Sequence, residues 1–521
     1  MIEHSSTVIT ASNSTFDSAF DSAIDSMAGF PILSLLLMSM PVAAVMILLT
    51  PDPLKARWIA LVTAVTGLFI SLVVVFNFDQ SNAGFQFVER VPWIPSLNID
   101  YIIGIDGISV LFLPLTSILF IGIILASWNT TRSMPKLFFT LLLLLETATQ
   151  GIFVSLNTIL FFLFWELTLI PIYFLINYWG IGPNRRYAAV KYTLVMMAGG
   201  VPLLFGFIVL AFDHANLNSG SGELVFDYMT LLNNPLPAEL QTTIFFLLLV
   251  GFAFKAPIFP LHTWLPAIAM EGPASIAAIM TGLKLGAYGL IRFTVPLAPD
   301  AAQNFHWLLA GLGITGVLYG AVLAISQTNL RKMLAFSSVS HVGLVILGIA
   351  SFSTQGIQGA LFQLFNFTIV AGGIFVLIGF LHHRTGSTEL VSLGGVAKTM
   401  PLLASFFFIF GLAGMGVPGT NGFVAENLIL VSVLESHTGA GIAALLGIVL
   451  AAAYFLNIYQ RAFLGPVKND VVAEALDLRR RELILAVVFC SFILLAGIFP
   501  NVILDITRAA SENWIGQLKP N

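Results

Sequence analysis

Five ionisable side chains interrupt long apolar runs of this sequence, and they are the residues best placed to do chemistry: Glu146, Glu166, Lys255, Lys284 and Glu426. A charge left at the centre of a membrane costs about 2.5–3.5 kcal/mol, so such residues face the interior of a helix bundle and mark paths for ions or protons. Burial disfavours the charged form of both residue types, so each can gain and lose a proton. The pattern predicts a proton relay. Structural ion pairs, or side chains that extend to the membrane surface, are the alternative.

Two of these residues lie beside sequences that break a helix. Lys255 is followed by two prolines in the run Lys255-Ala256-Pro257-Ile258-Phe259-Pro260, which frees backbone carbonyls and admits water. Glu426 follows a second break, Gly416-Val417-Pro418-Gly419. Lys284 lies eleven residues into its apolar run, which argues against a side chain that reaches the surface. We therefore expect all three to face the interior.

His341 is a softer candidate for the same relay. It ends the run Ser337-Ser338-Val339-Ser340-His341, in which hydroxyls lie close to the imidazole and could pass protons. A lone histidine is about as often a packing group.

Several other chemistries are excluded. Cys490 is the single cysteine, which rules out an intramolecular disulfide, a cysteine-ligated iron–sulfur cluster and a structural zinc site. Segments 311–316 and 414–419 match G-x-G-x-x-G, but neither follows a strand, and the sequence contains no Walker A motif. We expect no cofactor-binding or metal-binding residue in this chain, no nucleic-acid partner, and redox chemistry only outside it.

The composition indicates what must position these residues. Of 521 residues, 58% are hydrophobic and 9% are charged, against about 25% charged in a typical soluble domain. The mean hydropathy is +0.95. This is the composition of an all-α polytopic membrane protein surrounded by lipid.

Fourteen apolar stretches are long enough to cross about 30 Å of hydrocarbon as helices. The seventh and twelfth are broken by Pro and Gly. The fourteen are 30–49, 58–78, 105–127, 137–155, 157–179, 188–212, 242–261, 273–296, 305–326, 333–352, 357–381, 401–434, 440–463 and 483–505.

Basic residues test this count, because Lys and Arg accumulate in cytoplasmic loops. If the N-terminus lies outside the cytoplasm, sixteen of the 22 Lys and Arg residues fall in cytoplasmic loops, three fall outside and three lie within spans. The asymmetry predicts that both termini lie on the non-cytoplasmic side.

An internal repeat organises the spans. Ala198-Gly199-Gly200 and Ala371-Gly372-Gly373 each precede a helix broken by Pro. An odd number of spans in each unit forces the second unit to insert upside down, as in many transporters; chance recurrence of the motif in a Gly-rich chain is the alternative. We expect a polar extension at 1–29, helices 1–3 at 30–136, two inverted five-helix repeats at 137–296 and 305–463, a cytoplasmic loop at 464–482, and helix 14 with a tail at 483–521.

The motifs around these residues resemble the antiporter-like, proton-translocating subunits of complex I, in particular subunit 4, over about residues 30–510. The matching motifs are Trp165-Glu166-Leu167, Phe254-Lys255-Ala256-Pro257, Leu283-Lys284, Ser338-Val339-Ser340-His341, and Gly416-Val417-Pro418-Gly419 with Glu426. The sequence is most similar to the photosynthetic form of cyanobacteria or chloroplasts, whose complex reduces plastoquinone.

The resemblance implies a role for each residue. Glu166 and Lys255 resemble the pair of the cytoplasmic half-channel, Lys284 the central relay residue, and Glu426 the terminal donor, with His341 between the half-channels. It also implies homologous antiporter-like subunits and other membrane subunits as partners, iron–sulfur clusters in partner subunits, a quinone substrate, and a cyanobacterial thylakoid location. The implied function is proton translocation driven by electron transfer elsewhere in an NAD(P)H-quinone oxidoreductase complex.

Two departures from the family pattern affect the proposed path. The family usually reads Leu-Pro-Asp-Ala-His where this chain has Leu265-Pro266-Ala267-Ile268-Ala269, and Asn366 replaces a usual histidine. An amide does not titrate, so a proton passing Asn366 needs water or hydroxyl bridges. With these changes the chain is more similar to the subunit 4 of complexes specialised for carbon dioxide uptake than to the respiratory form. Two other functions stay open: a subunit of a multi-component sodium/proton antiporter, and a structural scaffold with impaired pumping.

Overall fold

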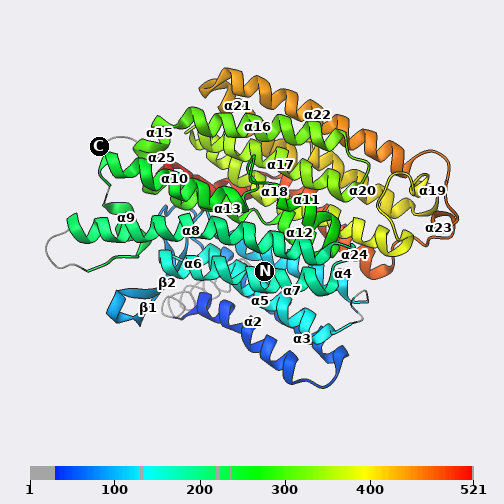
Figure 1. Ribbon diagram of the computed structural model, residues 1–521, viewed down its shortest axis with the longest axis horizontal. Coiled ribbons are helices and arrows are strands. Elements are labelled where there is room, and N and C mark those ends of the chain that lie inside the picture. The colour runs from blue at the N-terminus through cyan, green and yellow to red at the C-terminus, as the bar shows by residue number, and fades with distance from the viewer. Residues whose placement is uncertain (1–29, 130, 132, 218–222, 235, 519–521) are drawn as a thin grey trace, which may run out of the picture.

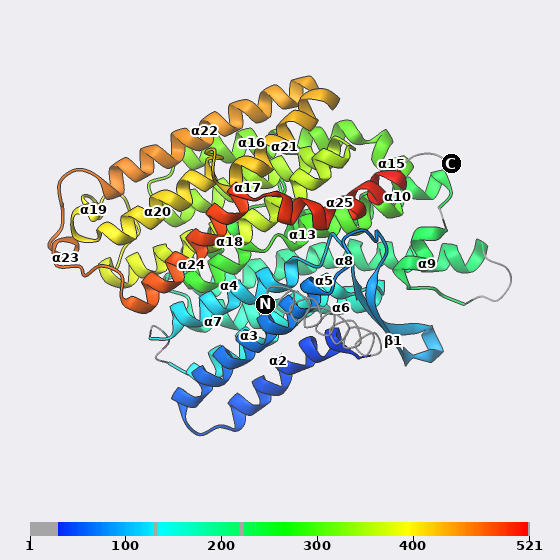
Figure 2. The same ribbon diagram turned by 180° about the vertical axis from the view of Figure 1, so that it is seen from behind.

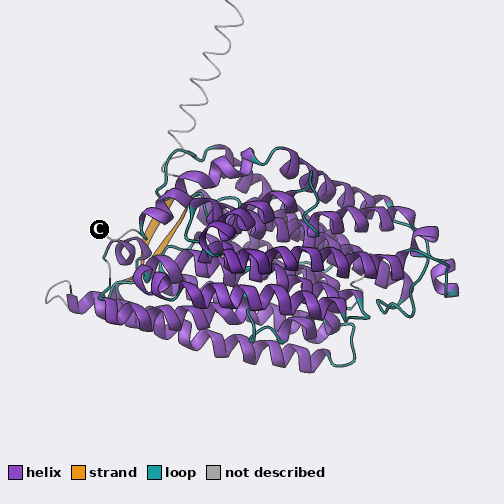
Figure 3. Cartoon of the chain, turned by 90° about the horizontal axis from the view of Figure 1, so that it is seen from above, coloured by secondary structure: helices purple, strands orange, loops and turns teal. Residues whose placement is uncertain are grey.

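The computed structural model describes residues 30–129, 131, 133–217, 223–234 and 236–518. The polar extension expected at 1–29 lies outside the described residues. The helices run alongside one another, and the two strands lie at one end of the bundle (Figure 3).

The described residues contain twelve helical segments long and apolar enough to cross a membrane. They are α2 (Ile32–Leu49), α3 (Pro53–Phe76), α5 (Pro135–Val154), α6 with α7 (Thr158–Leu167, Leu169–Trp179), α8 (Arg185–Leu217), α10 (Ala238–Lys255), α12 through α14 (Ala274–Leu297), α16 (His306–Ile325), α17 (Leu330–Ala350), α18 (Thr354–Thr385), α22 (Thr438–Phe463) and α24 (Arg480–Ile498).

Two shorter apolar helices, α4 (Phe112–Ser127) and α20 (Pro401–Gly414), account for the remaining expected spans. Helix α21 (Asn421–Ser436) completes the span that begins with α20. Each of the fourteen stretches expected from hydropathy coincides with one of these segments, so the all-α polytopic architecture is confirmed.

Short elements lie between the spans, within the span Ala274–Leu297 and after α24. They are η1 (Pro95–Leu97), α9 (Tyr228–Asn233), α11 (Trp264–Glu271), α13 (Leu285–Gly289), η2 (Leu290–Thr294), α14 (Val295–Leu297), α15 (Pro299–Asn304), α19 (Val396–Thr399), α23 (Asp470–Ala473) and α25 (Asn501–Gly516). Strands β1 (Gln86–Ile94) and β2 (Ile99–Ile105) form an antiparallel hairpin that hydropathy did not predict.

Burial divides the helices into a core and a periphery. The most apolar 18-residue windows of α5, α12 through α14, α17 and α18 are 89–100% buried, whereas those of α3 and α24 are only 33% and 28% buried. The outer helices expose Leu and Val that suit lipid or a neighbouring subunit. Figure 1 shows α12, α13, α17 and α18 between α22 with α16 on one side and α2 with α3 on the other. Glu146, Lys284, His341 and Asn366 therefore lie on the most deeply buried segments.

The two expected helix breaks are present. Helix α10 ends at Lys255, and the chain turns before α11 begins at Trp264. Helix α20 ends at Gly414, and α21 begins at Asn421.

Two further interruptions were not expected. One lies at Thr168, between α6 and α7, and the other at Leu283 and Lys284, between α12 and α13. Pro171 cannot donate a hydrogen bond to the carbonyl of Leu167, where α6 ends, and Gly282 directly precedes the second interruption, so the local sequence carries a weak signal for each. Beyond Lys284 the same span contains a π-helical turn, η2. Such turns recur at functional sites.

The two expected repeats share one packing relation. Helix α8, with Ala198-Gly199-Gly200, packs against α10, and α18, with Ala371-Gly372-Gly373, packs against α20. Each small-residue motif thus lies on a helix beside a broken one. The inverted relation of the two five-helix units, and their boundaries, stay predictions.

A buried ion pair closes the end of the bundle where the hairpin, α9 and α25 gather (Figure 2). Arg292, in η2, binds both carboxylate oxygens of Asp106, at 2.7 and 2.5 Å. The hydroxyl of Tyr228 donates to the carbonyl of Arg292 at 2.6 Å, and the indole of Trp514 donates to that of Ile291 at 2.8 Å. These contacts join four segments that are distant in sequence.

Replacing Asp106 with Asn is expected to lower the free energy of unfolding by about 3 kcal/mol, because it leaves a buried Arg292 without its counter-charge. The measurement is thermal unfolding of the full chain in detergent. The matched control is Asp505→Asn: its pair with Arg508 is 2.7 Å long, with side chains 46% and 58% exposed, and it is expected to cost less than about 1 kcal/mol. Equal losses in the two variants would contradict the prediction.

Candidate functional site

Lys255 is held at the interruption between α6 and α7. It is the last residue of α10 and is 7% exposed. Its Nζ donates to the carbonyl of Trp165 at 2.9 Å and to the hydroxyl of Thr168 at 2.8 Å, and lies 4.0 Å from the centre of the Trp165 ring. A carbonyl, a hydroxyl, an aromatic face and the negative end of a helix all favour a cation.

Glu166 lies beside this cation but does not touch it. The two groups interact electrostatically, yet they form no ion pair among the described residues. One oxygen, Oε1, is buried without a hydrogen-bond partner. The carboxylate fills the space above Gly200, where an added Cβ would lie 2.3 Å from Oε1. The second glycine of the Ala198-Gly199-Gly200 motif thus makes room for this acid.

Lys284 occupies the unexpected break between α12 and α13. It is 3% exposed, and its Nζ donates to the hydroxyl of Ser338 on α17. The ring of Phe367 lies 5.4 Å away. An ammonium has three donors, and Ser338 is the one hydrogen-bond acceptor that the described residues offer it. The other N–H groups of the Lys284 ammonium must therefore donate to water, or their number must fall by the loss of a proton.

The breaks at Lys255 and Lys284 are in direct contact. Gly286, two residues after Lys284, packs against Ala256, one residue after Lys255. A Cβ added at Gly286 would lie 2.2 Å from the backbone nitrogen of Ala256. A movement of either interrupted helix must therefore displace the other, because Gly286 has no side chain that could change rotamer at this contact.

His341 and Glu426 meet at the second expected break. The imidazole lies between two carbonyls: Nδ1 is 2.9 Å from the oxygen of Ser337, and Nε2 is 3.0 Å from that of Gly414, the last residue of α20. Nε2 is also 3.7 Å from Oε1 of Glu426. Carbonyls only accept hydrogen bonds, and a neutral imidazole carries a single N–H. A neutral imidazole can therefore satisfy one of these two carbonyls, and a protonated imidazole can satisfy both.

Gly416 allows Glu426 to approach the break. It has φ +66°, a conformation that favours glycine, and a Cβ there would lie 2.2 Å from Oε2 of Glu426.

A cavity of about 40 Å³ lies between α17, α18 and the end of α20, lined by Ser337, Ser338, His341, Gln363 and Asn366, with apolar neighbours. It therefore joins the hydroxyl that holds Lys284 to the imidazole beside Glu426. A water needs roughly 10–15 Å³ and two to four polar partners. The Oδ1 atom of Asn366 is buried without a partner. The cavity therefore suits a bridging water.

Sequence reasoning missed three residues of this arrangement. Thr168 and Ser338 each accept a hydrogen bond from a buried lysine, and Tyr454 on α22 lies 2.7 Å from the hydroxyl of Ser337. Ser338 stands in the serine run before His341, so that run carried a signal. Nothing in the local sequence singles out Thr168 or Tyr454, which reach the site through tertiary packing.

Glu146 is not brought to the other candidates by any ion pair or hydrogen bond of the described residues. It is 0% exposed on α5, and neither of its carboxylate oxygens has a hydrogen-bond partner. Its place in a relay stays a prediction.

The described residues contain no group of three or more His, Cys, Asp or Glu that could hold a metal ion.

A profile of the family described as "NADH:quinone oxidoreductase/Mrp antiporter, TM" matches residues 155–451, which include every candidate except Glu146. The chain belongs to this family.

Relatives place it with the subunit 4 type of complex I. The chain is 35% identical over 467 residues to NADH-quinone oxidoreductase subunit M of Rickettsia conorii, a match covering 89% of this chain and 93% of the relative. It is 36% identical over 496 residues to NAD(P)H-quinone oxidoreductase chain 4 1 of Synechococcus sp., covering 92% and 93%. The two identities are nearly equal, so the expected bias towards the cyanobacterial form is not confirmed.

Solved structures agree with this family. A chain of respiratory complex I from Thermus thermophilus superposes with a TM-score of 0.84 at 28% identity, covering 94% of this chain and 100% of that one. A chain of the Mrp complex from Dietzia sp. gives 0.80 at 21% identity, covering 94% and 98%. At that identity the second likeness shows the shared fold alone.

Replacing Gly416 with Ala is expected to lower the free energy of unfolding by about 1–3 kcal/mol, because it forces a non-glycine residue to positive φ and pushes a methyl group into Glu426. Thermal unfolding of the full chain measures the loss. Gly439→Ala is the matched control, since a Cβ there meets nothing within 4 Å. A Gly416 variant as stable as this control would contradict the geometry.

Proposed function

We propose that this chain is a proton-translocating membrane subunit of a quinone-reducing NAD(P)H dehydrogenase-type complex, driven by electron transfer in other subunits. The observation that carries the proposal is the series of proton-binding groups inside the bundle, four of them buried and most of them at or beside helix interruptions. It runs from Glu166 and Lys255, through Lys284, to His341 and Glu426. Burying an idle charge is costly, and four such residues are more than packing alone explains.

The first step is a change in the interaction between Glu166 and Lys255. The two charges do not touch, so a small movement of the α6–α7 interruption changes their attraction steeply at the low dielectric of the core. Helix α13 packs directly on the end of α10 through Gly286 and Ala256. When Lys255 carries a less compensated charge, its repulsion weakens proton binding at Lys284.

The proton then moves outward from Lys284. Ser338 accepts from its ammonium and borders the cavity that reaches His341. The imidazole takes the proton, stabilised by the carbonyls of Ser337 and Gly414, and passes it to Glu426. When the pairing of Glu166 and Lys255 returns, Lys284 is reloaded from the cytoplasmic side.

Family membership also suggests the partner subunits, the quinone and the orientation of the chain in the membrane. The partners are other membrane subunits, including homologous antiporter-like subunits, with the iron–sulfur clusters in subunits outside this chain and surrounding lipids. The quinone is plastoquinone if the chain comes from a cyanobacterial thylakoid membrane. Both termini lie on the non-cytoplasmic side.

The rival functions give different results. A subunit of a multi-component sodium/proton antiporter would support sodium-dependent transport without quinone chemistry. A scaffold would assemble and leave proton translocation unchanged when its buried lysines are replaced. The residues of helix α11 favour the scaffold alternative, since Ala267 and Ala269 offer only methyl groups where the family usually has an acid and a histidine.

Replacing Lys284 with Ala is expected to abolish proton translocation coupled to quinone reduction, because the central proton carrier is removed, while the complex still assembles. Proton uptake into sealed vesicles and subunit content of the purified complex are the measurements. Lys398→Ala, on the short helix α19, is the control and should pump normally. Normal pumping by an assembled Lys284 variant would refute the relay.

Replacing Asn366 with Leu is expected to reduce proton translocation about tenfold or more, because a leucine side chain fills the cavity of about 40 Å³ and removes the amide that would hold water. Asn366→His should preserve translocation, since the imidazole titrates. Vesicle proton uptake distinguishes these outcomes. Unimpaired translocation in the Leu variant as well as in the His variant would show that the proton does not pass this cavity.

A further inference from the structure

A cavity of about 380 Å³ lies outside the proposed relay, among the ends of α4, α5, α7, α12, α17 and α18. It is at the end of the bundle that the basic residues predict to face the cytoplasm. Its polar lining comprises Ser127, Thr131, Ser275, Arg331, His382 and His383. No carboxylate lines it, so every side chain that can carry a charge there is basic.

Arg331 gives the cavity a fixed positive charge. The side chain is buried, and its NH1 and NH2 groups donate to the carbonyls of Met270 at 3.2 Å and Gly272 at 2.8 Å. Its Nε is buried without a partner. Arg331 belongs to no ion pair among the described residues; the carboxylate of Glu271 attracts it electrostatically but accepts its hydrogen bond from the backbone N–H of Asn184 at 2.7 Å. A charged donor is therefore left unsatisfied at this cavity.

The N-terminus of α12 adds a second, independent attraction for an anion. The helix begins at Ala274 after Pro273, and both Ala274 and Ser275 line the cavity. Its first N–H to find a partner is that of Ile276, which reaches the carbonyl of Pro273 at 3.0 Å. The N–H groups before it have no partner within the helix, and they bind anions readily.

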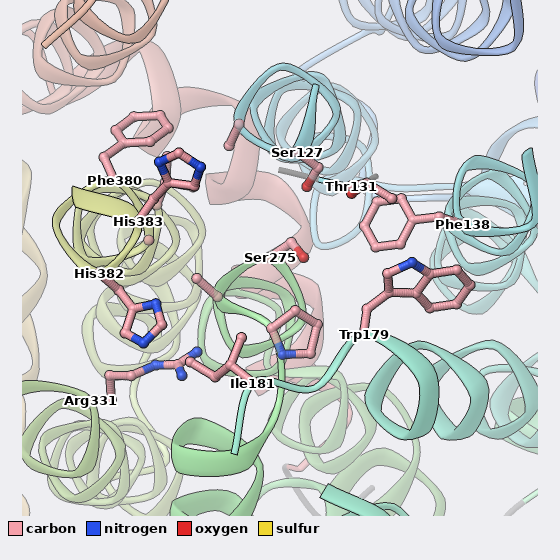
Figure 4. A pocket seen from close by; sticks show the side chains of 15 residues that line it. Ser127, Thr131, Phe138, Trp179, Ile181, Ser275, Arg331, Phe380, His382 and His383 are labelled. Carbon is pink, nitrogen blue, oxygen red and sulfur yellow. The ribbon is translucent and has the colours of Figure 1, made fainter. Parts of the chain in front are cut away.

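The opposite wall is apolar. Figure 4 shows Arg331, His382 and His383 on one side of the cavity, Phe138 and Trp179 on the other, and Ser275 between them. A ligand with an anionic group and an adjoining apolar part would satisfy both sides. Basic pockets between transmembrane helices on the cytoplasmic side are known recognition sites for lipid phosphates.

We propose that this cavity binds a phosphate group, held by Arg331, the N-terminus of α12 and the two histidines. The group belongs either to the head of an anionic lipid or to free phosphate. The same helix that binds it at its N-terminus leads directly to Lys284 at its C-terminus. An occupied site therefore fixes the position of α12, while the binding itself does not depend on the proposed relay.

The test measures binding by calorimetry to the full chain, purified in detergent and freed of lipid. It is titrated with dihexanoyl phosphatidylglycerol, with dihexanoyl phosphatidylcholine and with inorganic phosphate. Saturable binding of phosphatidylglycerol at least about tenfold tighter than phosphatidylcholine supports a lipid phosphate. Phosphate bound as tightly as phosphatidylglycerol supports free phosphate as the source. If neither anion binds saturably, or phosphatidylcholine binds equally well, the proposal is wrong.

Ser275→Asp tests the location. It places a carboxylate at the start of α12 inside the cavity and is expected to weaken anion binding at least about tenfold. Ser326→Asp, on an exposed position at the same end of the bundle, is the matched control and should bind like the unmodified chain. The double variant His382→Gln, His383→Gln should also bind more weakly, which protects the test if Ser275→Asp does not fold. Unchanged binding in whichever of these cavity variants folds would place the anion elsewhere.

Discussion

A positive charge buried among apolar helices must find oxygen atoms, and in this fold several of these atoms are carbonyls at helix ends. Lys255 binds the carbonyl of Trp165 where α6 gives way to α7. His341 binds the carbonyl of Gly414, where α20 ends. Arg331 binds the carbonyls of Met270 and Gly272 at the end of α11. The last carbonyls of a helix have no partner within it and carry partial negative charge, so these helix ends can solvate a cation where water is scarce.

The same interruptions make the charges adjustable. A continuous helix would hold its carbonyls in internal hydrogen bonds, and a cation beside it would stay unsolvated. A broken helix has two short rigid parts and a few residues that can change conformation. Because Gly286 places the break at Lys284 directly against Ala256, the first two lysines of the series share one mechanical contact. The proposed coupling needs no extended chain of residue contacts, only this contact and the electrostatic interaction between Glu166 and Lys255.

The acids and cations inside the bundle differ in their hydrogen-bond partners. The cations have named hydrogen-bond partners, whereas both oxygens of Glu146 and one oxygen of Glu166 have none among the described residues. Two of the acids lie against glycines, Glu166 over Gly200 and Glu426 over Gly416. The absence of a side chain at each glycine lets the carboxyl lie directly against the backbone. Groups held in this way suit the binding and release of a proton better than the permanent storage of charge.

The sequence alone determined the number of spans, the two proline-containing breaks and the residues that carry ionisable groups into the core. These features are local: hydropathy over about twenty residues and the chemistry of proline and glycine decide them. Only the tertiary structure decided which groups meet. The interruption at Lys284, the hydroxyls of Thr168, Ser338 and Tyr454, the separation of Glu166 from Lys255 and the basic cavity at Arg331 all depend on contacts between segments distant in sequence. No local pattern records such contacts, because a helix face does not specify which residue of another helix will lie against it.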